Sequence, residues 1–358
     1  MFFNVTKRKD KNVEEDRKKR ATQEKKTNKP VVILVIASID DNRSYDWSKI
    51  FDQSYIKDFN GDEREIKIVQ AGWDCLSIHA DSPSMSPSTP ALVHVRQKEG
   101  NKKLITIQPD FVLIRNEVRG VTHDYRNILY GLMYAGIPSL NSLESIYAFL
   151  ERPIVQSELH KIQRKFGSAK FPVISQSYYS TYRTMMYGRK FPTVLKVGHA
   201  HAGMGKMKVL NHHDWEDVRS VVAMTEGKYC TAEPYIDGEF DIRIQKIGTN
   251  NYRAFKRTDV SGNWKTNTGC SIINEIEVTD KYKFYIDEAS NMFNGLSICT
   301  VDIIVERNTG KEYILEVNGT SSGLMPDKAK EDNKLIRDLV LEKMNDIFKM
   351  KAVGEKTE

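Results

Sequence analysis

The chain has 358 residues, of which 40% are hydrophobic and 28% charged, and its formal net charge is +6. This length allows two or three domains with cores of their own, and the composition is typical of a globular protein. The cysteines Cys75, Cys230, Cys270 and Cys299 form no CxxC pair, which argues against a disulfide framework or a zinc site. The longest aliphatic run, Val31 to Ile36, is too short to cross a bilayer. We therefore expect a cytoplasmic protein.

Positive charge is concentrated at the start of the chain. Residues 1–29 contain 11 Lys or Arg and 5 Asp or Glu, so their net charge of +6 equals that of the whole chain. A basic segment with few apolar residues is predicted to be a disordered leader. On charge alone it could bind acidic phospholipid or nucleic acid, and a solvated tail is the simpler interpretation. We expect no nucleic-acid partner.

Residues 30–142 have the pattern of a small doubly wound α/β domain. Several apolar runs are typical of parallel strands buried on both faces: Val31–Ile36, Ile66–Ala71 and Phe111–Arg115. A hairpin is predicted within 93–107, and helical spacing over Thr122–Ala135 predicts a helix that ends at Gly136. No glycine fingerprint follows the first strand, which argues against a dinucleotide cofactor in this domain.

Residues 143–350 combine helices with paired strands. Ser142 is predicted to cap a helix. The sequence Glu151-Arg152-Pro153 is predicted to end that helix before a second one, which ends near Phe166. Further helices are predicted at His213–Thr225 and Lys330–Lys349. The predicted strands are 171–178, 191–197, 230–236, 241–247, 252–258, 298–305 and 313–317.

The stretch Phe191–Val209 joins a buried strand to a glycine-rich turn flanked by lysines. Its glycines, among them Gly203 and Gly205, would let backbone N–H groups approach an oxyanion, while Lys196 and Lys206 supply positive charge. A strand-like segment follows in place of a helix, so the stretch is neither a Walker loop nor a dinucleotide fingerprint. It is interpreted as a phosphate-binding loop between two strands. The alternative is a glycine-rich hairpin that binds nothing.

The last predicted hairpin carries two acids. If its turn is centred on Thr309, Asp302 and Glu316 face each other in apolar surroundings, and two ionised carboxylates there would repel unless a cation lies between them. Asn318 lies on the same face and would add a neutral oxygen ligand. These residues predict a site for a divalent cation. The alternative is a turn off-centre by one residue, which would point the two acids to opposite faces.

The middle of the chain adds positive charges suited to phosphate. Arg243 and Arg257 lie on the two strands of a predicted hairpin. The polar loop 261–269 contains Lys265 and Asn267 and could be a flap over a polyphosphate or a simple surface loop. Together with the lysine-flanked turn and the paired acids, this set is suited to a metal–triphosphate complex.

Residues 43–350 carry a set of specific motifs: Pro109–Arg115, Tyr134–Ser139, Asn141–Leu143, Lys196–His201, Gly203–Lys206 and Val260–Gly269. These motifs, with Glu233–Ile236 and Glu316–Asn318, resemble the ATP-grasp superfamily and, within it, the synapsin family. The resemblance implies an α/β and α+β architecture in which a pre-ATP-grasp domain precedes two subdomains that clasp ATP. The expected divisions are a basic leader at 1–29, a pre-ATP-grasp domain at 30–142, an ATP-grasp domain at 143–350 and a tail at 351–358.

The resemblance also implies roles for single residues. Lys196 would contact the α- and β-phosphates, the backbone of 233–236 the adenine edge, Glu239 the ribose and Lys265 the γ-phosphate. Arg152 stands where vertebrate members have a nucleotide-binding lysine, and Asp302 where a glutamate is usual. The full set predicted to bind ATP is Arg152, Lys196, Gly203, Gly205, Lys206, Glu233, Ile236, Glu239, Arg243, Arg257, Lys265 and Asn267. The residues predicted to hold Mg²⁺ or Ca²⁺ are Asp302, Glu316 and Asn318.

Two functions remain open. One is a nucleotide-binding regulator on the cytoplasmic face of synaptic vesicles, controlling vesicle clustering and neurotransmitter release. The resemblance then implies acidic phospholipid or the vesicle surface and actin as partners, and a homodimer or homotetramer. The other is an ATP-dependent carboxylate ligase, which needs the same ATP site and a second substrate pocket. We favour the regulator on the resemblance, and no sequence motif identifies a second substrate.

Overall fold

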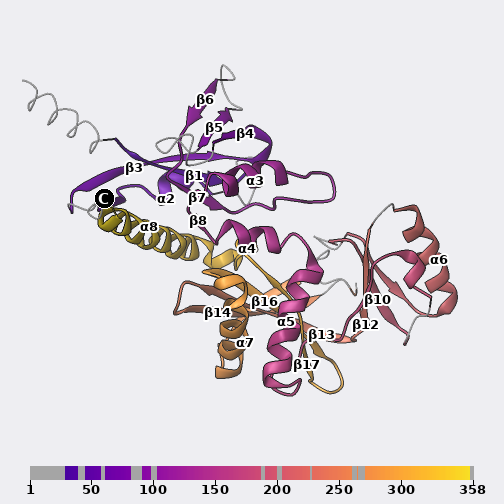
Figure 1. Ribbon diagram of the computed structural model, residues 1–358. Helices are drawn as coiled ribbons and strands as arrows, with labels where there is room; N and C mark the ends of the chain where they lie inside the picture. Colours follow the sequence, from indigo (N-terminus) through magenta and orange to yellow (C-terminus); the bar gives the residue numbers. More distant parts are fainter. Residues whose placement is uncertain are drawn as a thin grey trace, which may run out of the picture.

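The computed structural model describes residues 29–38, 45–57, 61–81, 91–97, 103–186, 190–199, 204–225, 228–259, 264 and 271–354. In these ranges the strands form four sheets, and helices cover them on several faces (Figure 1).

The first sheet has the order β2-β3-β1-β7-β8. Strands β1 (Val31–Ile36), β3 (Glu63–Ala71), β7 (Phe111–Ile114) and β8 (Ser139–Leu140) are parallel, and β2 (Tyr55–Lys57) is antiparallel. The even-numbered residues of β1 pack with α3 (Arg126–Tyr134) and α4 (Leu143–Ala148), and the odd-numbered residues with α2 (Trp47–Ile50) and α8 (Ala329–Gly354). Because both faces of the sheet are covered, the predicted doubly wound α/β unit is confirmed.

A smaller antiparallel sheet lies beside it. Its order is β4 (Leu76–Ala80), β5 (Ala91–Arg96), β6 (Leu104–Ile107), which confirms the predicted hairpin. Strand β4 was not predicted, although Leu76, Ile78 and Ala80 alternate with polar residues as in a half-buried strand.

Residues 177–234 form what we call the small subdomain. Its sheet has the order β11 (Lys206–Val209), β10 (Thr193–Val197), β12 (Cys230–Pro234), β9 (Ser177–Tyr179), and α6 (His212–Met224) covers one face through Trp215 and Val222. Figure 1 shows this unit projecting away from the rest of the chain. The strand predicted at 171–178 was largely wrong, since regular pairing begins only at Ser177 and the earlier residues make a single bridge through Val173.

The large subdomain is a five-stranded antiparallel sheet. Its order is β15 (Ser271–Ile276), β14 (Asn251–Asp259), β13 (Gly238–Ile247), β16 (Ile298–Glu306), β17 (Glu312–Asn318). Helices α5 (Arg152–Phe166) and α7 (Asp280–Ser290) pack on one face. The predicted cap is confirmed, since the Ser142 side chain accepts a hydrogen bond from the Ser145 amide, and Pro153 lies in the first turn of α5.

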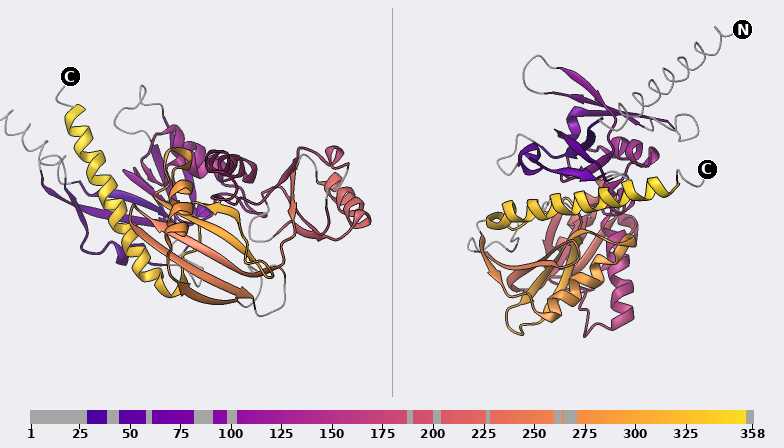
Figure 2. Two further views of the ribbon diagram at one scale, coloured as in Figure 1. Left: turned by 90° about the horizontal axis from the view of Figure 1, so that it is seen from below. Right: turned by 90° about the vertical axis from the view of Figure 1, so that its left-hand side faces the viewer.

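Helix α8 runs between the first sheet and the large subdomain (Figure 2). Its residues Ile336, Val340 and Met344 share one apolar core with β1 and with Ile247 and Ile298 of the large subdomain. This core therefore belongs to both halves of the chain.

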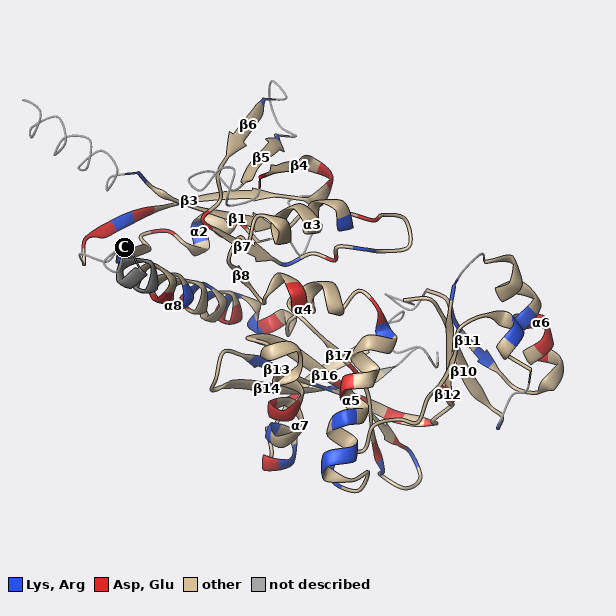
Figure 3. Ribbon diagram, in the orientation of Figure 1, with Lys and Arg blue, Asp and Glu red and all other residues tan. Residues whose placement is uncertain are grey.

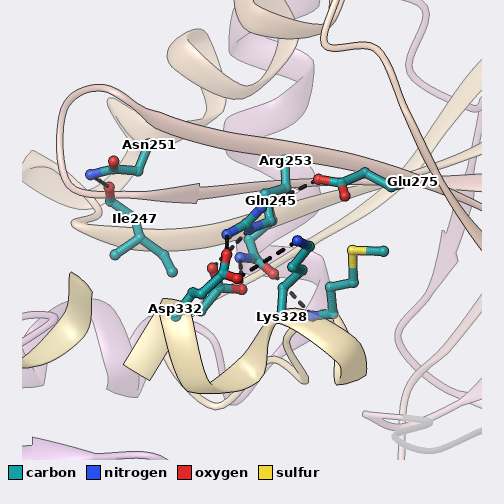
Figure 4. A network of polar contacts seen from close by, with 9 residues as sticks. Gln245, Ile247, Asn251, Arg253, Glu275, Lys328 and Asp332 are labelled. Carbon is teal, nitrogen blue, oxygen red and sulfur yellow. Dashed lines mark hydrogen bonds and ion pairs between the residues drawn. The ribbon is translucent and has the colours of Figure 1, made fainter. Parts of the chain in front are cut away.

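A buried polar network fixes the start of α8 (Figure 4). The Asp332 side chain is 0% exposed and accepts from Arg253 Nε at 2.8 Å and from Gln245 Nε2 at 2.6 Å. The Gln245 side-chain oxygen Oε1 in turn accepts from the Met325 amide at 3.3 Å. Since a buried carboxylate is costly unless it is paired, Arg253 and Gln245 hold α8 on the sheet.

Polar contacts also join the segment after β17 to the first domain. Arg115 donates to the carbonyl oxygens of Thr320 and Ser322, and the Thr320 hydroxyl donates to the Ile114 carbonyl at 2.8 Å. Asn141 pairs with the backbone of Ile298 through both its amide nitrogen and its oxygen. Within the described ranges, no helix is long and apolar enough to cross a membrane.

Candidate functional site

Two lysines face each other across the small subdomain. In the antiparallel pair β10–β11, Lys196 lies directly opposite Lys206. Like charges in this arrangement repel, so the pair is stable only with anions nearby. Lys196 Nζ lies 2.6 Å from Glu233 Oε1, with both side chains under a tenth exposed. Burial lowers the pKa of Lys206, and attraction to Glu316 opposes that shift.

Gly205 closes the turn between these two strands. Its φ is +72°, and a Cβ at this position would lie 3.2 Å from the Val197 carbonyl oxygen. A side chain here would strain the backbone and press on β10. The glycine therefore lets the Val197 amide donate to the Gly205 carbonyl at 2.9 Å and keeps Lys206 in register with Lys196.

Glu233 lies at the end of β12, where the chain leaves the small subdomain for β13. Besides Lys196, Gln176 Nε2 donates to its Oε2 at 2.7 Å. Ile236 is half-buried in the link that follows, and Glu239 is exposed at the start of β13. These residues therefore lie where the chain passes from the small to the large subdomain.

The predicted pairing of the two acids is confirmed, and by an unexpected route. Near the turn the register is one residue away from the predicted one, with Ile303 opposite Ile314. The register then shifts so that Asp302 lies opposite Glu316 and Thr300 opposite Asn318, which leaves Leu315 as an extra residue in β17. This irregularity is a β-bulge, and it turns both acids to one face.

Arginines neutralise both acids. Arg243 donates to the two oxygens of Asp302 at 2.6 and 2.7 Å, and Arg257 and the Asn318 amide also contact this carboxylate, at 3.4 and 3.2 Å. Glu316 pairs with Arg152.

These contacts set the protonation of Glu316. Burial alone would raise its pKa, but the charges of Arg152, Lys206 and Lys196 hold it well below the usual value. Glu316 is therefore ionised at neutral pH and lies within reach of cations from both subdomains.

Most of the predicted site residues within the described ranges therefore come together around Glu316 and Glu233. Figure 3 shows basic residues on the strands of the small subdomain and along α5. Glu239 makes no contact with this group among the described interactions. Gly203, Lys265 and Asn267 lie outside the described residues.

The donor chemistry suits a hard divalent cation. Two carboxylates on neighbouring strands and the side-chain oxygen of Asn318 are the ligand types that Mg²⁺ and Ca²⁺ prefer. Both carboxylates are engaged with Arg152 and Arg243. An ion would therefore have to displace those guanidinium groups from the carboxylates.

Comparison with known proteins gives the family. One family model, the synapsin ATP-binding domain, matches residues 141–346, and a second, the synapsin pre-ATP-grasp domain, matches residues 25–139. The chain belongs to the synapsin family. It is 37% identical to the Synapsin of Drosophila melanogaster over 310 aligned residues. The alignment covers 86% of this chain and 29% of that protein. The chain thus spans less than a third of that curated relative.

Solved structures show the same fold in more distant proteins. The D-alanine–D-alanine ligase of Coxiella burnetii matches with a TM-score of 0.56 and 14% identity, over 92% of this chain and 99% of that one. The VanG D-Ala:D-Ser ligase of Enterococcus faecalis matches with a TM-score of 0.55 and 13% identity, over 89% and 100%. The predicted combination of a pre-ATP-grasp domain and an ATP-grasp fold is confirmed. Residues 141–346 correspond to the ATP-binding domain of the synapsin family.

Sequence reasoning missed several residues of this synapsin-family site. Gln176 and Phe149 line a recess with Arg152, Glu316 and Asn318. Phe149 lies three residues before Arg152, but its contact with the segment around Glu316, like that of Gln176, joins positions far apart in the sequence. Lys208 places its Nζ 3.5 Å from the ring centroid of Tyr235. The alternation of Lys206 and Lys208 could have indicated that both lie on one face of β11.

Proposed function

We propose that this chain binds ATP and one divalent cation between its small and large subdomains and that nucleotide occupancy regulates it. The proposal rests on two pairs of facing like charges. Lys196 faces Lys206 on the sheet of the small subdomain, and Asp302 faces Glu316 on the sheet of the large subdomain. A metal–triphosphate complex has negative oxygens for the lysines and a cation for the acids. It is therefore complementary to both pairs at once.

Binding would exchange the partners of these charges. Lys196 and Arg152, which contact Glu233 and Glu316, would turn to phosphate oxygens. The carboxylate of Glu316 would then be released toward the ion, which supplies neutralising charge for the phosphates. Either partner alone would leave some of these charges uncompensated, so nucleotide and metal should bind cooperatively.

The remaining predicted residues have supporting roles in the proposal. Asp302 and Asn318 would complete the site for Mg²⁺ or Ca²⁺ with Glu316. Lys206, Gly203 and Gly205 would lie over the phosphates, Ile236 and the backbone at Glu233 would contact the adenine, and Glu239 would reach the ribose. Arg243, Arg257, Lys265 and Asn267 would surround the terminal phosphate.

We also propose the cellular setting of the family for this chain. It would act at the cytoplasmic face of synaptic vesicles and regulate vesicle clustering and neurotransmitter release, as a homodimer or homotetramer. Residues 1–29, with a net charge of +6, would contact acidic phospholipid, and actin would be a further partner. Membership of the synapsin family supports this proposal.

A second candidate function is an ATP-dependent ligase. The observation in its favour is a second recess beside the proposed nucleotide site, which shares Phe149 with the first. A ligase needs such a place for an acceptor.

Phosphorus NMR of ATP with the purified chain, in Mg²⁺ and separately in Ca²⁺, tests the proposal. We expect broadened ATP signals with either ion and much less broadening without a divalent ion. ADP and phosphate accumulating over many hours would favour the ligase. Sharp ATP lines at high protein concentration would refute the ATP site itself.

A further inference from the structure

The second recess lies between the two domains. Its walls come from 114–119 after β7, from 141–150 around α4, and from 319–321 after β17. It contains about 430 Å³ of space between its atoms, a figure that includes open solvent. Ile114, Val118, Ile146 and Leu150 make much of its lining apolar.

Most polar side chains in these walls are already engaged. The Asn116 side-chain oxygen Oδ1 accepts from the Ser38 amide at 3.2 Å, and the Asn141 side chain pairs with the backbone of Ile298. The Thr320 hydroxyl donates to a carbonyl of β7. These groups build the walls and leave little capacity for a ligand.

The cation in the lining is also engaged. Arg119 pairs with Glu151 through its Nη1, and its Nε lies 3.9 Å from Asp124. Two carboxylates therefore already compensate this guanidinium. An anionic ligand would have to compete with both of them.

Glu117 is different. It is solvent-exposed and is the only acid among the described residues that line the recess. Among the described residues, its carboxylate makes no hydrogen bond or ion pair. The surrounding walls raise the pKa of Glu117 through burial, and the attraction of His123 and Arg152 only partly offsets this. A carboxylate beside apolar walls is thus left without a directly bonded cation.

We propose that this recess binds a small molecule that carries an ammonium group, with Glu117 as its anionic partner. The ammonium would donate to the Glu117 carboxylate, which has no hydrogen bond or ion pair with the described residues. The Phe149 ring, also in the lining, would offer a surface for the ligand's apolar part or its positive charge.

The recess is also placed to sense the nucleotide. Phe149 lines both recesses, and Gly319 directly follows Asn318 of the proposed metal site. A Cβ at Gly319 would lie only 3.3 Å from the Phe149 ring, so ring and backbone are in close contact. A shift at Asn318 on metal binding would therefore move one wall of the amine site. This coupling rests on the proposed function, whereas amine binding itself does not.

Saturation-transfer NMR with three small probes tests the proposal. L-alaninamide carries an ammonium group, propionamide is its neutral analogue, and propionate is an anion. We expect alaninamide to bind to the full chain, and propionamide and propionate to bind at least about tenfold more weakly, because a charged hydrogen bond is lost. Glu117→Gln should weaken alaninamide binding by a similar factor.

The matched control is Glu144→Gln, since Glu144 is an exposed acid of α4 outside the lining. It should leave alaninamide binding unchanged. Because Glu117 has no bonded partner in the part of the chain that the structure describes, both variants should keep the wild-type circular dichroism spectrum and melting temperature. Equal binding of alaninamide and propionamide, no effect of Glu117→Gln, or no alaninamide binding would overturn the proposal.

ATP titrations of the same three proteins separate the two proposals. We expect Glu117→Gln to bind Mg²⁺–ATP as the wild type does. If the wild type binds alaninamide and no ATP, the amine site stands and the nucleotide site fails. If the wild type binds ATP but binds alaninamide no more tightly than propionamide, the nucleotide site stands and the amine site fails.

Discussion

Replacing Lys196 by alanine separates two roles of one side chain. Lys196 and Glu233 lie 2.6 Å apart, with side chains 5% and 7% exposed. Without the lysine, the Glu233 carboxylate keeps only the hydrogen bond from Gln176 among the contacts of the described residues, and it becomes a buried carboxylate without its ion-pair partner. Breaking a buried ion pair from one side typically costs about 3–5 kcal/mol of unfolding free energy. The variant should be markedly less stable even without ligand.

The same substitution should weaken ATP binding. A hydrogen bond to a charged group contributes about 1.5–3 kcal/mol, which corresponds to roughly 10- to 150-fold in Kd. We expect the lower half of this range, because Lys196 must leave Glu233 before it can contact a phosphate.

Calorimetric titration of Mg²⁺–ATP and urea unfolding would measure the two effects on the same protein. Adding Glu233→Gln to Lys196→Ala removes the unpaired carboxylate, so the double variant should recover stability and still bind ATP weakly. Lys161→Ala, on the exposed side of α5, is the matched lysine control and should change neither quantity by much. A folded Lys196→Ala protein with wild-type ATP affinity would refute the reasoning and leave Lys196 as a structural partner of Glu233.

Two further predictions concern the acids. Asp302→Asn should remove most of the dependence of ATP affinity on Mg²⁺ or Ca²⁺, measured by titration with and without each ion; it should also lower the melting temperature, because Arg243 loses a charged partner on each of its two bonds. A lower melting temperature with unchanged metal dependence would show a purely structural role. Because the pKa of Glu316 is lowered well below 4.5 in the folded chain, its contribution to stability is present above pH 4.5 and lost as the pH falls toward that lowered value. Urea unfolding from pH 7 to pH 3 should therefore show a steeper loss for the wild type than for Glu316→Gln, and parallel curves would contradict this.

The sequence predicts the acid pair better than it predicts the reason for the pair. The prediction that Asp302 lies opposite Glu316 came from pairing residues at equal distances on either side of a turn centred on Thr309. The actual turn is offset by one residue, and the bulge at Leu315 restores the pairing. A bulge depends on how a strand packs against its neighbours, so hairpin counting does not reveal it.

Contacts between residues far apart in the sequence could not be predicted from local sequence patterns. Arg243 was predicted as a phosphate-binding cation from its place in a hairpin. Its bidentate contact with Asp302 depends on β13 lying next to β16, which begins some fifty residues later in the chain. The contact of Arg152 with Glu316 likewise joins α5 to β17. Periodicity identifies the strands, and their order in the sheet comes from packing that residue spacing does not record.

The apolar core around α8 has a consequence for how the chain folds. Ile336, Val340 and Met344 are fully or almost fully buried between β1 and the large subdomain, and Arg115 holds backbone carbonyls of the segment that leads to this helix. A fragment limited to either half would expose one side of this core to water. We therefore expect residues 25–139 and 141–346 to unfold together, and exchanging either segment between proteins would require rebuilding the apolar surface that it leaves behind.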